Sequence, residues 1–117
     1  MKVAAVMRDL MFFSRIDDAA SRAGASLVRV DDPDRVPSGT DLVLVDWADR
    51  ADEWASTLTG LRDEGARLVA FGPHTDLEAH AAAKAAGLGP MLARSALLRT
   101  LDTVLADQAS APSTRRR

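Results

Sequence analysis

The strongest constraint on the fold is a repeated alternation of short apolar runs with segments of helical spacing. Five runs have the length of strands, and each is followed by a helical segment or by the remnant of one. The third run is apolar without interruption from Leu42 to Val45, which is typical of a central parallel strand covered on both faces. In chain order, the runs span residues 2–6, 26–30, 41–46, 67–72 and 90–93.

The longer segments between these runs place apolar residues every three or four positions. Thr75-x-x-Glu78 has the form of a capping box, and Ser95 is expected to cap the last helix. The stretch 31–40 contains two prolines and a glycine, so it has room for one helical turn at most. The expected helices lie within residues 10–24, 51–65, 74–87 and 95–108.

Five strands alternating with helices predict one doubly wound α/β domain with a parallel sheet. The commonest five-strand order is 2-1-3-4-5, the flavodoxin-like arrangement, here with the second helix reduced to a turn. We expect this domain to cover residues 1–107. Residues 108–117 have no periodicity and are expected to form a disordered tail, and the sequence assigns no role to its basic end, Arg115–Arg117.

This topology predicts where a functional site would lie. In open α/β sheets, sites form beyond the carboxyl ends of the strands, at the switch point between the first and third strands. Asp46 then ends a buried strand because the strand reaches the surface there. The residues expected at this edge are Arg8, Asp9, Asp46, Trp47, Gly72, Pro73, Arg94 and Ser95.

The chain resembles the receiver domain of bacterial two-component response regulators over residues 2 to about 107. DLVLVDW (41–47) is similar to the strand that ends in the phosphoaccepting aspartate, which makes Asp46 its counterpart. AAAKAAGLGPMLARS (81–95) resembles the family's Ala-rich helix, glycine, short strand and Lys-Pro. The resemblance implies Mg²⁺ held by acids after the first strand, and a new phosphate bound by a Thr or Ser and a Lys.

Several positions depart from the family's pattern. After the first strand, Arg8 precedes a single acid, Asp9, where the family prefers an acid pair. Gly72 stands where a Thr or Ser is expected, and Arg94-Ser95 replaces Lys-Pro. One carboxylate beside that of Asp46, with an arginine nearby, is a poor Mg²⁺ site because this hard cation needs several oxygen ligands.

The sequence therefore predicts a degenerate pseudo-receiver, a regulatory protein–protein interaction module that is not an enzyme and needs no cofactor. The alternative is a functional receiver in which Asp9 and Asp46 hold Mg²⁺ and Asp46 is phosphorylated. Both interpretations describe a signal-transduction protein, and the sequence does not show whether Asp46 is ever phosphorylated.

Asp46 has two candidate partners. Arg8 or Arg94 could pair with its carboxylate through a guanidinium and occupy the place of the cation. Alternatively, both arginines point into water and Asp46 only caps the next helix. Trp47 and Trp54 are expected to be packing anchors, and Trp47 would report on anything that binds beside it.

The resemblance also implies a protein-binding face. It comprises residues 74–87, 90–93 and 95–108, and it would bind a partner protein or a second copy as a homodimer. Six alanines between Ala79 and Ala86 would permit close approach. Alternatively, these alanines pack against the protein's own sheet. The sequence does not indicate the partner's identity or pathway.

Composition argues against other classes of function. The 117 residues are 47% apolar and include no cysteine, so disulfides, thiolate metal sites and thiol nucleophiles are excluded. The net charge is −2, and because Arg115–Arg117 carry three positive charges, residues 1–114 carry −5. This acidic balance makes nucleic-acid binding an unfavoured interpretation. The apolar run before Arg8 is too short for a signal peptide or membrane span, so we expect a cytoplasmic protein.

Motifs for other chemistry are missing. The sequence has no G-x-S-x-G, P-loop or G-x-G-x-x-G. His74 and His80 are the only histidines, and a separation of about 240° around a helix prevents them from sharing a metal ion. Neither a hydrolase nor a cofactor-binding protein is therefore indicated.

Overall fold

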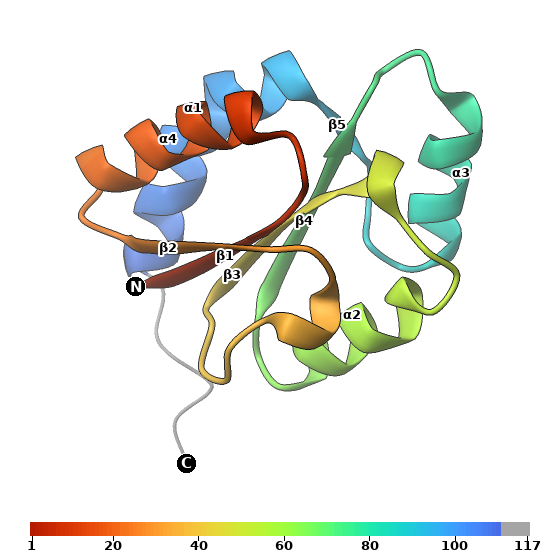
Figure 1. Ribbon diagram of the computed structural model, residues 1–117, viewed down its shortest axis with the longest axis horizontal. Helices are drawn as coiled ribbons and strands as arrows, with labels where there is room; N and C mark the ends of the chain where they lie inside the picture. The colour runs from red at the N-terminus through yellow and green to blue at the C-terminus, as the bar shows by residue number, and fades with distance from the viewer. Residues whose placement is uncertain (111–117) are drawn as a thin grey trace.

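A five-stranded parallel sheet forms the middle layer of the protein in the computed structural model, which describes residues 1–110 (Figure 1). Every neighbouring pair is parallel, and the spatial order is β2-β1-β3-β4-β5, as predicted. The strands are β1 (Lys2–Val6), β2 (Ser26–Val30), β3 (Leu42–Asp46), β4 (Arg67–Gly72) and β5 (Leu92–Ala93).

Helices cover both faces of the sheet (Figure 1). α1 (Leu10–Arg22) and α4 (Arg94–Ser110) pack on one face, where their apolar side chains meet Leu42 and Leu44 of β3. α2 (Trp54–Asp63) and α3 (Leu77–Ala85) pack on the other face against Val43 and Val45. All five residues of β3 are buried, as the unbroken apolar run indicated.

The connection from β2 to β3 contains only the single 3-10 turn η1 (Pro33–Arg35). Asp32 caps this turn, Pro33 occupies its first position, and Pro37 lacks the N–H group that a longer helix would need four residues on. The predicted reduction of this helix is therefore confirmed. It leaves Val28 in the middle of β2 40% exposed.

The helix starts differ from the predictions at two places. Asp76, not Thr75, caps α3, because the Asp76 side chain accepts a hydrogen bond from the N–H of Ala79 at 3.0 Å. α4 begins at Arg94 with Ser95 already inside it, because β5 leads into the helix without an intervening loop. The capping-box and Ser95-cap predictions were therefore wrong.

Both ends of the last strand–helix unit also lie elsewhere than expected. β5 contains only Leu92 and Ala93, because the turn through Gly89 and Pro90 precedes it. α4 extends to Ser110, three residues into the segment that was expected to be tail. Residues 111–117, which include the basic end, lie outside the described residues. Among residues 1–110, no helix is both long enough and apolar enough to span a bilayer.

Candidate functional site

Three connections meet at the carboxyl edge of the sheet and bring Asp9, Asp46 and Arg94 together. Asp9 lies between β1 and α1, Asp46 is the last residue of β3, and Arg94 is the first residue of α4. Parallel strands end at one edge, so topology alone places these residues near one another. Asp9 and Asp46 begin turns as N-caps, and the Arg94 guanidinium contacts both.

The Asp46 carboxylate is buried and uses both of its oxygens. Its side chain is 1% exposed. Oδ1 accepts a hydrogen bond from the N–H of Ala48 at 3.2 Å, which caps the 3-10 turn η2 (Trp47–Asp49). Oδ2 accepts from Nη2 of Arg94 at 2.7 Å. Asp46 therefore pairs with Arg94 and also caps a turn, so the alternative in which both arginines point into water and Asp46 only caps is wrong.

Arg94 joins the two acidic N-caps through one guanidinium. Its Nη1 lies 3.6 Å from Oδ2 of Asp9, whose Oδ1 accepts a hydrogen bond from the N–H of Phe12 at 3.0 Å. The guanidinium also lies over the Phe12 ring, 5.4 Å from its centroid. The side chain of Arg94 thus connects the ends of β1, β3 and β5.

Burial and charge act in opposite directions on Asp46. Loss of water around the carboxylate raises the pKa of Asp46 above 3.8, and the neighbouring Asp49 adds to the rise. The Arg94 charge and the two hydrogen bonds lower it, but burial has the larger effect. The positive charge of Arg94 therefore offsets part of the cost of burying the ionised Asp46 carboxylate.

The remaining predicted site residues lie at the same edge but make different contacts. Arg8 is exposed, and its backbone N–H, not its guanidinium, donates to Oδ2 of Asp49 at 3.2 Å. Trp47 is buried, as expected of a packing anchor, and so is Trp54. Ser95 is exposed. Arg8 and Ser95 therefore do not join the group formed by Asp46 and Arg94.

Gly72 ends β4 beside a methionine rather than beside open space. A Cβ added at Gly72 would lie 3.0 Å from Sδ of Met91 and 3.8 Å from the backbone nitrogen of Ala48. Met91 is buried. Its thioether therefore fills the volume in which the side chain of a Thr or Ser would begin.

Gly72→Ser, which supplies the hydroxyl expected of a receiver, should lower the free energy of unfolding by about 1 kcal/mol. The loss is small because the clash falls on the flexible end of Met91. Urea denaturation of both proteins measures it. In a Met91→Ala background the same serine should cost less, and an equal loss in both backgrounds would contradict this account.

Four residues that sequence analysis did not single out also shape the site. They are Phe12 under the Arg94 guanidinium, Asp49, Arg50 and Met91. Arg50 donates to the carbonyl oxygen of Trp47 at 3.0 Å and lies over the Trp47 ring, 5.6 Å from its centroid. Residues three apart lie on the same side of a 3-10 turn. The spacing of Trp47 and Arg50 would therefore have indicated this contact only if a 3-10 turn had been predicted there.

The donor set differs from what a Mg²⁺ ion requires. Asp46 has no oxygen without a protein hydrogen bond, and one oxygen of Asp9 caps α1. The Arg94 guanidinium lies between the two carboxylates, where a cation would have to bridge them. Within residues 1–110, no group of three or more His, Cys, Asp or Glu side chains could hold a metal ion. These residues do not fit a bound Mg²⁺ ion.

Other polar features have structural explanations. A ring nitrogen of His80 lies 3.2 Å from the backbone carbonyl oxygen of His74, so the contact joins one histidine ring to the backbone of the other.

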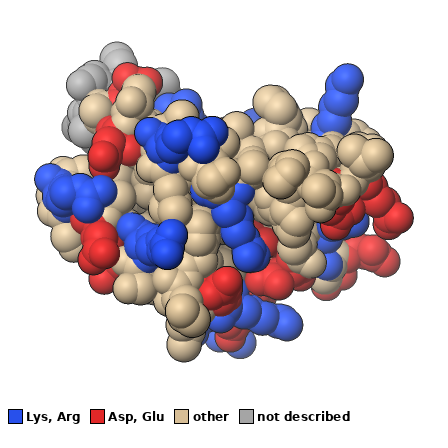
Figure 2. All heavy atoms as spheres, turned by 90° about the horizontal axis from the view of Figure 1, so that it is seen from above, with Lys and Arg blue, Asp and Glu red and all other residues tan. Residues whose placement is uncertain are grey.

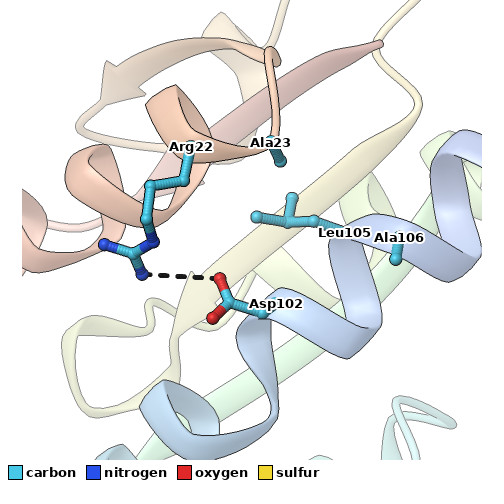
Figure 3. Close-up of a pocket in the computed structure, with 5 residues that line it drawn as sticks. All are labelled: Arg22, Ala23, Asp102, Leu105 and Ala106. Carbon is cyan, nitrogen blue, oxygen red and sulfur yellow. Dashed lines mark hydrogen bonds and ion pairs between the residues drawn. The ribbon is translucent and has the colours of Figure 1, made fainter.

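A hollow of about 410 Å³ opens between the ends of α1 and α4, on the side of the sheet where the strands begin (Figure 3). Arg22 and Asp102 pair there at 3.4 Å, but both side chains are mostly exposed and the pair contributes little stability.

Solved structures of response regulators and their receiver domains have a fold similar to that of this chain. The receiver domain of Francisella response regulator 1452 has a TM-score of 0.67 and 15% identity, covering 92% of this chain and 94% of that one. A response regulator from Thermotoga maritima has a TM-score of 0.66 and 17% identity, covering 94% and 98% respectively. A response regulator receiver protein from Burkholderia phymatum has a TM-score of 0.66 and 20% identity, covering 90% and 94%.

These likenesses concern the backbone rather than the sequence. No protein-family model matches the sequence, and no curated protein does. The similarity extends over nearly the whole of both chains in each comparison. It therefore includes the complete parallel sheet with the order β2-β1-β3-β4-β5. The chain therefore has the fold of a response regulator receiver domain.

Proposed function

We propose that this protein is a pseudo-receiver, a regulatory interaction module in which the Arg94 guanidinium takes the place of the metal ion. The observation that carries the proposal is the state of Asp46: its side chain is 1% exposed and both its oxygens accept hydrogen bonds. A phosphoryl donor must reach a carboxylate oxygen in line with the leaving group. Asp46 offers no such approach without loss of the Arg94 pair.

The ion pair supports a fixed rather than a switchable edge. Arg94 holds the connections after β1 and β3 and the start of α4 in one arrangement. In a two-state switch, a ligand must bind one state more tightly than the other. The Arg94 guanidinium is always charged, so it compensates the charge of Asp46 without a ligand that could bind and dissociate. The domain therefore keeps one arrangement of this edge and presents one surface to its partner.

The exposed surface supports a protein partner. Leu10, Met11 and Leu77 are 62%, 85% and 77% exposed, and all three lie where helices begin at the carboxyl edge. Exposed apolar residues beside a polar rim are typical of interaction sites. We place the partner at this edge and along the face of α3, β5 and α4, and the protein in the cytoplasm.

The alanines of α3 are shared between the sheet and this face. Ala79 and Ala83 are buried, Ala82 and Ala86 are half-buried, and Ala81 and Ala85 are exposed. The exposed pair leaves a helix surface that a partner could approach closely. Basic side chains are interspersed with acidic ones on the face of the molecule seen in Figure 2, which supports a protein partner over a nucleic acid.

Beryllofluoride, a phosphoryl mimic, tests the proposal against the receiver alternative. In a Trp54→Phe background, which leaves Trp47 as the only indole, Mg²⁺ followed by beryllofluoride should produce no saturable change in fluorescence. Calorimetric titration of the unmodified protein should show no heat of binding. A saturable response that Asp46→Asn abolishes would establish a functional phosphoacceptor and overturn the proposal.

A further inference from the structure

The free edge at β2 has the properties of an association surface. All five residues of β2 pair in register with β1, without a bulge or proline. The outermost strand on the other side of the sheet is β5, which has only two residues and is shortly preceded by Pro90. Proteins protect sheet edges with short strands, prolines, bulges, charged side chains or covering elements, and of these β2 has only the charge of Arg29, which pairs with Asp31.

The hydrogen-bonding direction along β2 follows from its ladder with β1. Ser26 donates to the carbonyl oxygen of Met1, and Val30 accepts from the N–H of Met7, so these groups of β2 point inward. Because the direction alternates along a strand, the N–H and C=O groups of Leu27 and Arg29 point outward at the free edge. Two residues with outward groups, two positions apart, can form four hydrogen bonds with an antiparallel strand.

One face of this edge lacks its helix. Val28 lies on the face covered elsewhere by α2 and α3, but beside β2 only the single turn η1 is present. Val28 is consequently 40% exposed. A groove of about 250 Å³ lies beside the first half of β2, lined by Val3, Leu27, Val28 and Pro37 together with Lys2, Ser26 and Thr40.

We propose that β2 pairs with β2 of a second copy of this chain, antiparallel, about a two-fold axis at Val28. In this register, Leu27 lies opposite Arg29 of the second copy, so the outward groups of both strands are hydrogen-bonded. The two Val28 residues form the central, non-hydrogen-bonded pair, in which side chains approach most closely. The two sheets become one continuous sheet.

The charges at this edge favour a second copy over an unrelated strand. The pairing opposes each Arg29 to a leucine rather than to another arginine, and Arg29 already pairs with Asp31 at 2.9 Å. Lys2, in register with Ser26, has no acidic group within ion-pair distance of its amine in residues 1–110. The antiparallel arrangement brings the acidic run after β2, from Asp31 to Asp34, to the end of the strand at which Lys2 of the other copy lies.

This pairing leaves the carboxyl edge free, so it is compatible with the proposed partner surface and independent of the chemistry of Asp46. A single strand pair buries less area than a permanent dimer interface. We therefore expect reversible association with a dissociation constant on the order of micromolar to tens of micromolar.

Sedimentation velocity of the full chain from about 1 to 200 µM should show a monomer–dimer equilibrium. Val28→Lys and Val28→Glu each place like charges at the centre, and each should weaken association at least about tenfold. An equimolar mixture of the two variants should form a heterodimer, because Lys and Glu then face each other. Asp63→Lys changes an exposed residue at the end of α2, away from both β2 and the proposed partner surface, and should leave association unchanged.

A cross-link locates the interface directly. The chain has no cysteine, so Val28→Cys can form a disulfide only between two copies. The Cα separation of a central non-hydrogen-bonded pair, about 4.5 Å, lies within disulfide range. Mild oxidation should give a covalent dimer with Val28→Cys and little with Asp63→Cys. The proposal would be overturned if the protein were monomeric at every concentration, or if Val28→Lys left a dimer intact. The free edge of β2 would then be available only to a strand of a different protein.

Discussion

Replacing Arg94 with methionine should lower the free energy of unfolding at pH 7 by about 2–3 kcal/mol. Removal of one partner from a buried ion pair costs about 3–5 kcal/mol, because the other charge remains buried without compensation. The Asp46 side chain is 1% exposed and that of Arg94 is 37% exposed, so water compensates part of the loss. The expected effect therefore lies below the range for a fully buried pair.

The loss should depend on pH in a defined direction. Burial already raises the folded-state pKa of Asp46 above 3.8, and removal of the Arg94 charge raises it further. A group with a raised pKa stabilises the fold in acid, and this contribution disappears as the pH rises through the folded-state pKa. The Arg94→Met loss should thus be largest near neutral pH and should shrink as the pH falls and Asp46 takes up a proton.

Three variants isolate this cause. Arg99→Met removes an exposed arginine from the same helix and should change stability by less than about 0.5 kcal/mol. Arg94→Lys keeps a charge near Asp46 but loses the planar contact with two carboxylates, so it should cost less than methionine. With Asp46→Asn already present, Arg94→Met should cost little. A full loss in that background, or the same loss at pH 4 and pH 7, would contradict the buried-charge explanation.

The convergence of Asp9, Asp46 and Arg94 could be predicted because it depends only on topology. Apolar runs gave the bounds of β1, β2 and β4 residue by residue, and parallel strands must end at one edge. The choice between Arg8 and Arg94 could not be predicted in the same way. It depends on the start of α4 at Arg94 itself, whereas Ser95 was expected to be the cap.

Contacts that depend on side-chain conformation were also beyond prediction. The departure at Gly72 was visible in the sequence, but the thioether of Met91 that fills the place was not. Met91 comes from the turn before β5, and its reach to β4 follows from three rotatable bonds rather than from any periodicity. The same applies to Arg50 over Trp47, where the 3-10 turn sets the direction of the side chain.

Phe71 forms the apolar support beneath this edge. It lies in register with Asp46 on β4, is fully buried, and packs against Phe12 with ring centroids 5.3 Å apart. Phe12 in turn lies beneath the guanidinium of Arg94. Loss of the Phe71 ring would therefore leave a cavity and also free Phe12 to move away from the guanidinium.

Phe71→Ala should lower the free energy of unfolding by about 3–5 kcal/mol, the cost of a large buried cavity, measured by urea denaturation. The smaller change Phe71→Leu allows a double-mutant cycle with Arg94→Met in a protein that remains folded. Because both residues act on Phe12, the two losses should differ from additivity by more than about 0.5 kcal/mol.

Leu105 provides the matched control for that cycle. It is as buried as Phe71 and belongs to the same apolar cluster, but it lies eleven residues along α4 from Arg94, or about 16 Å. Leu105→Ala and Arg94→Met should therefore be additive. Additivity for Phe71 as well would mean that Phe12 holds its place without the second ring. The guanidinium would then be positioned by the two carboxylates alone, and the aromatic pair would contribute only to the core.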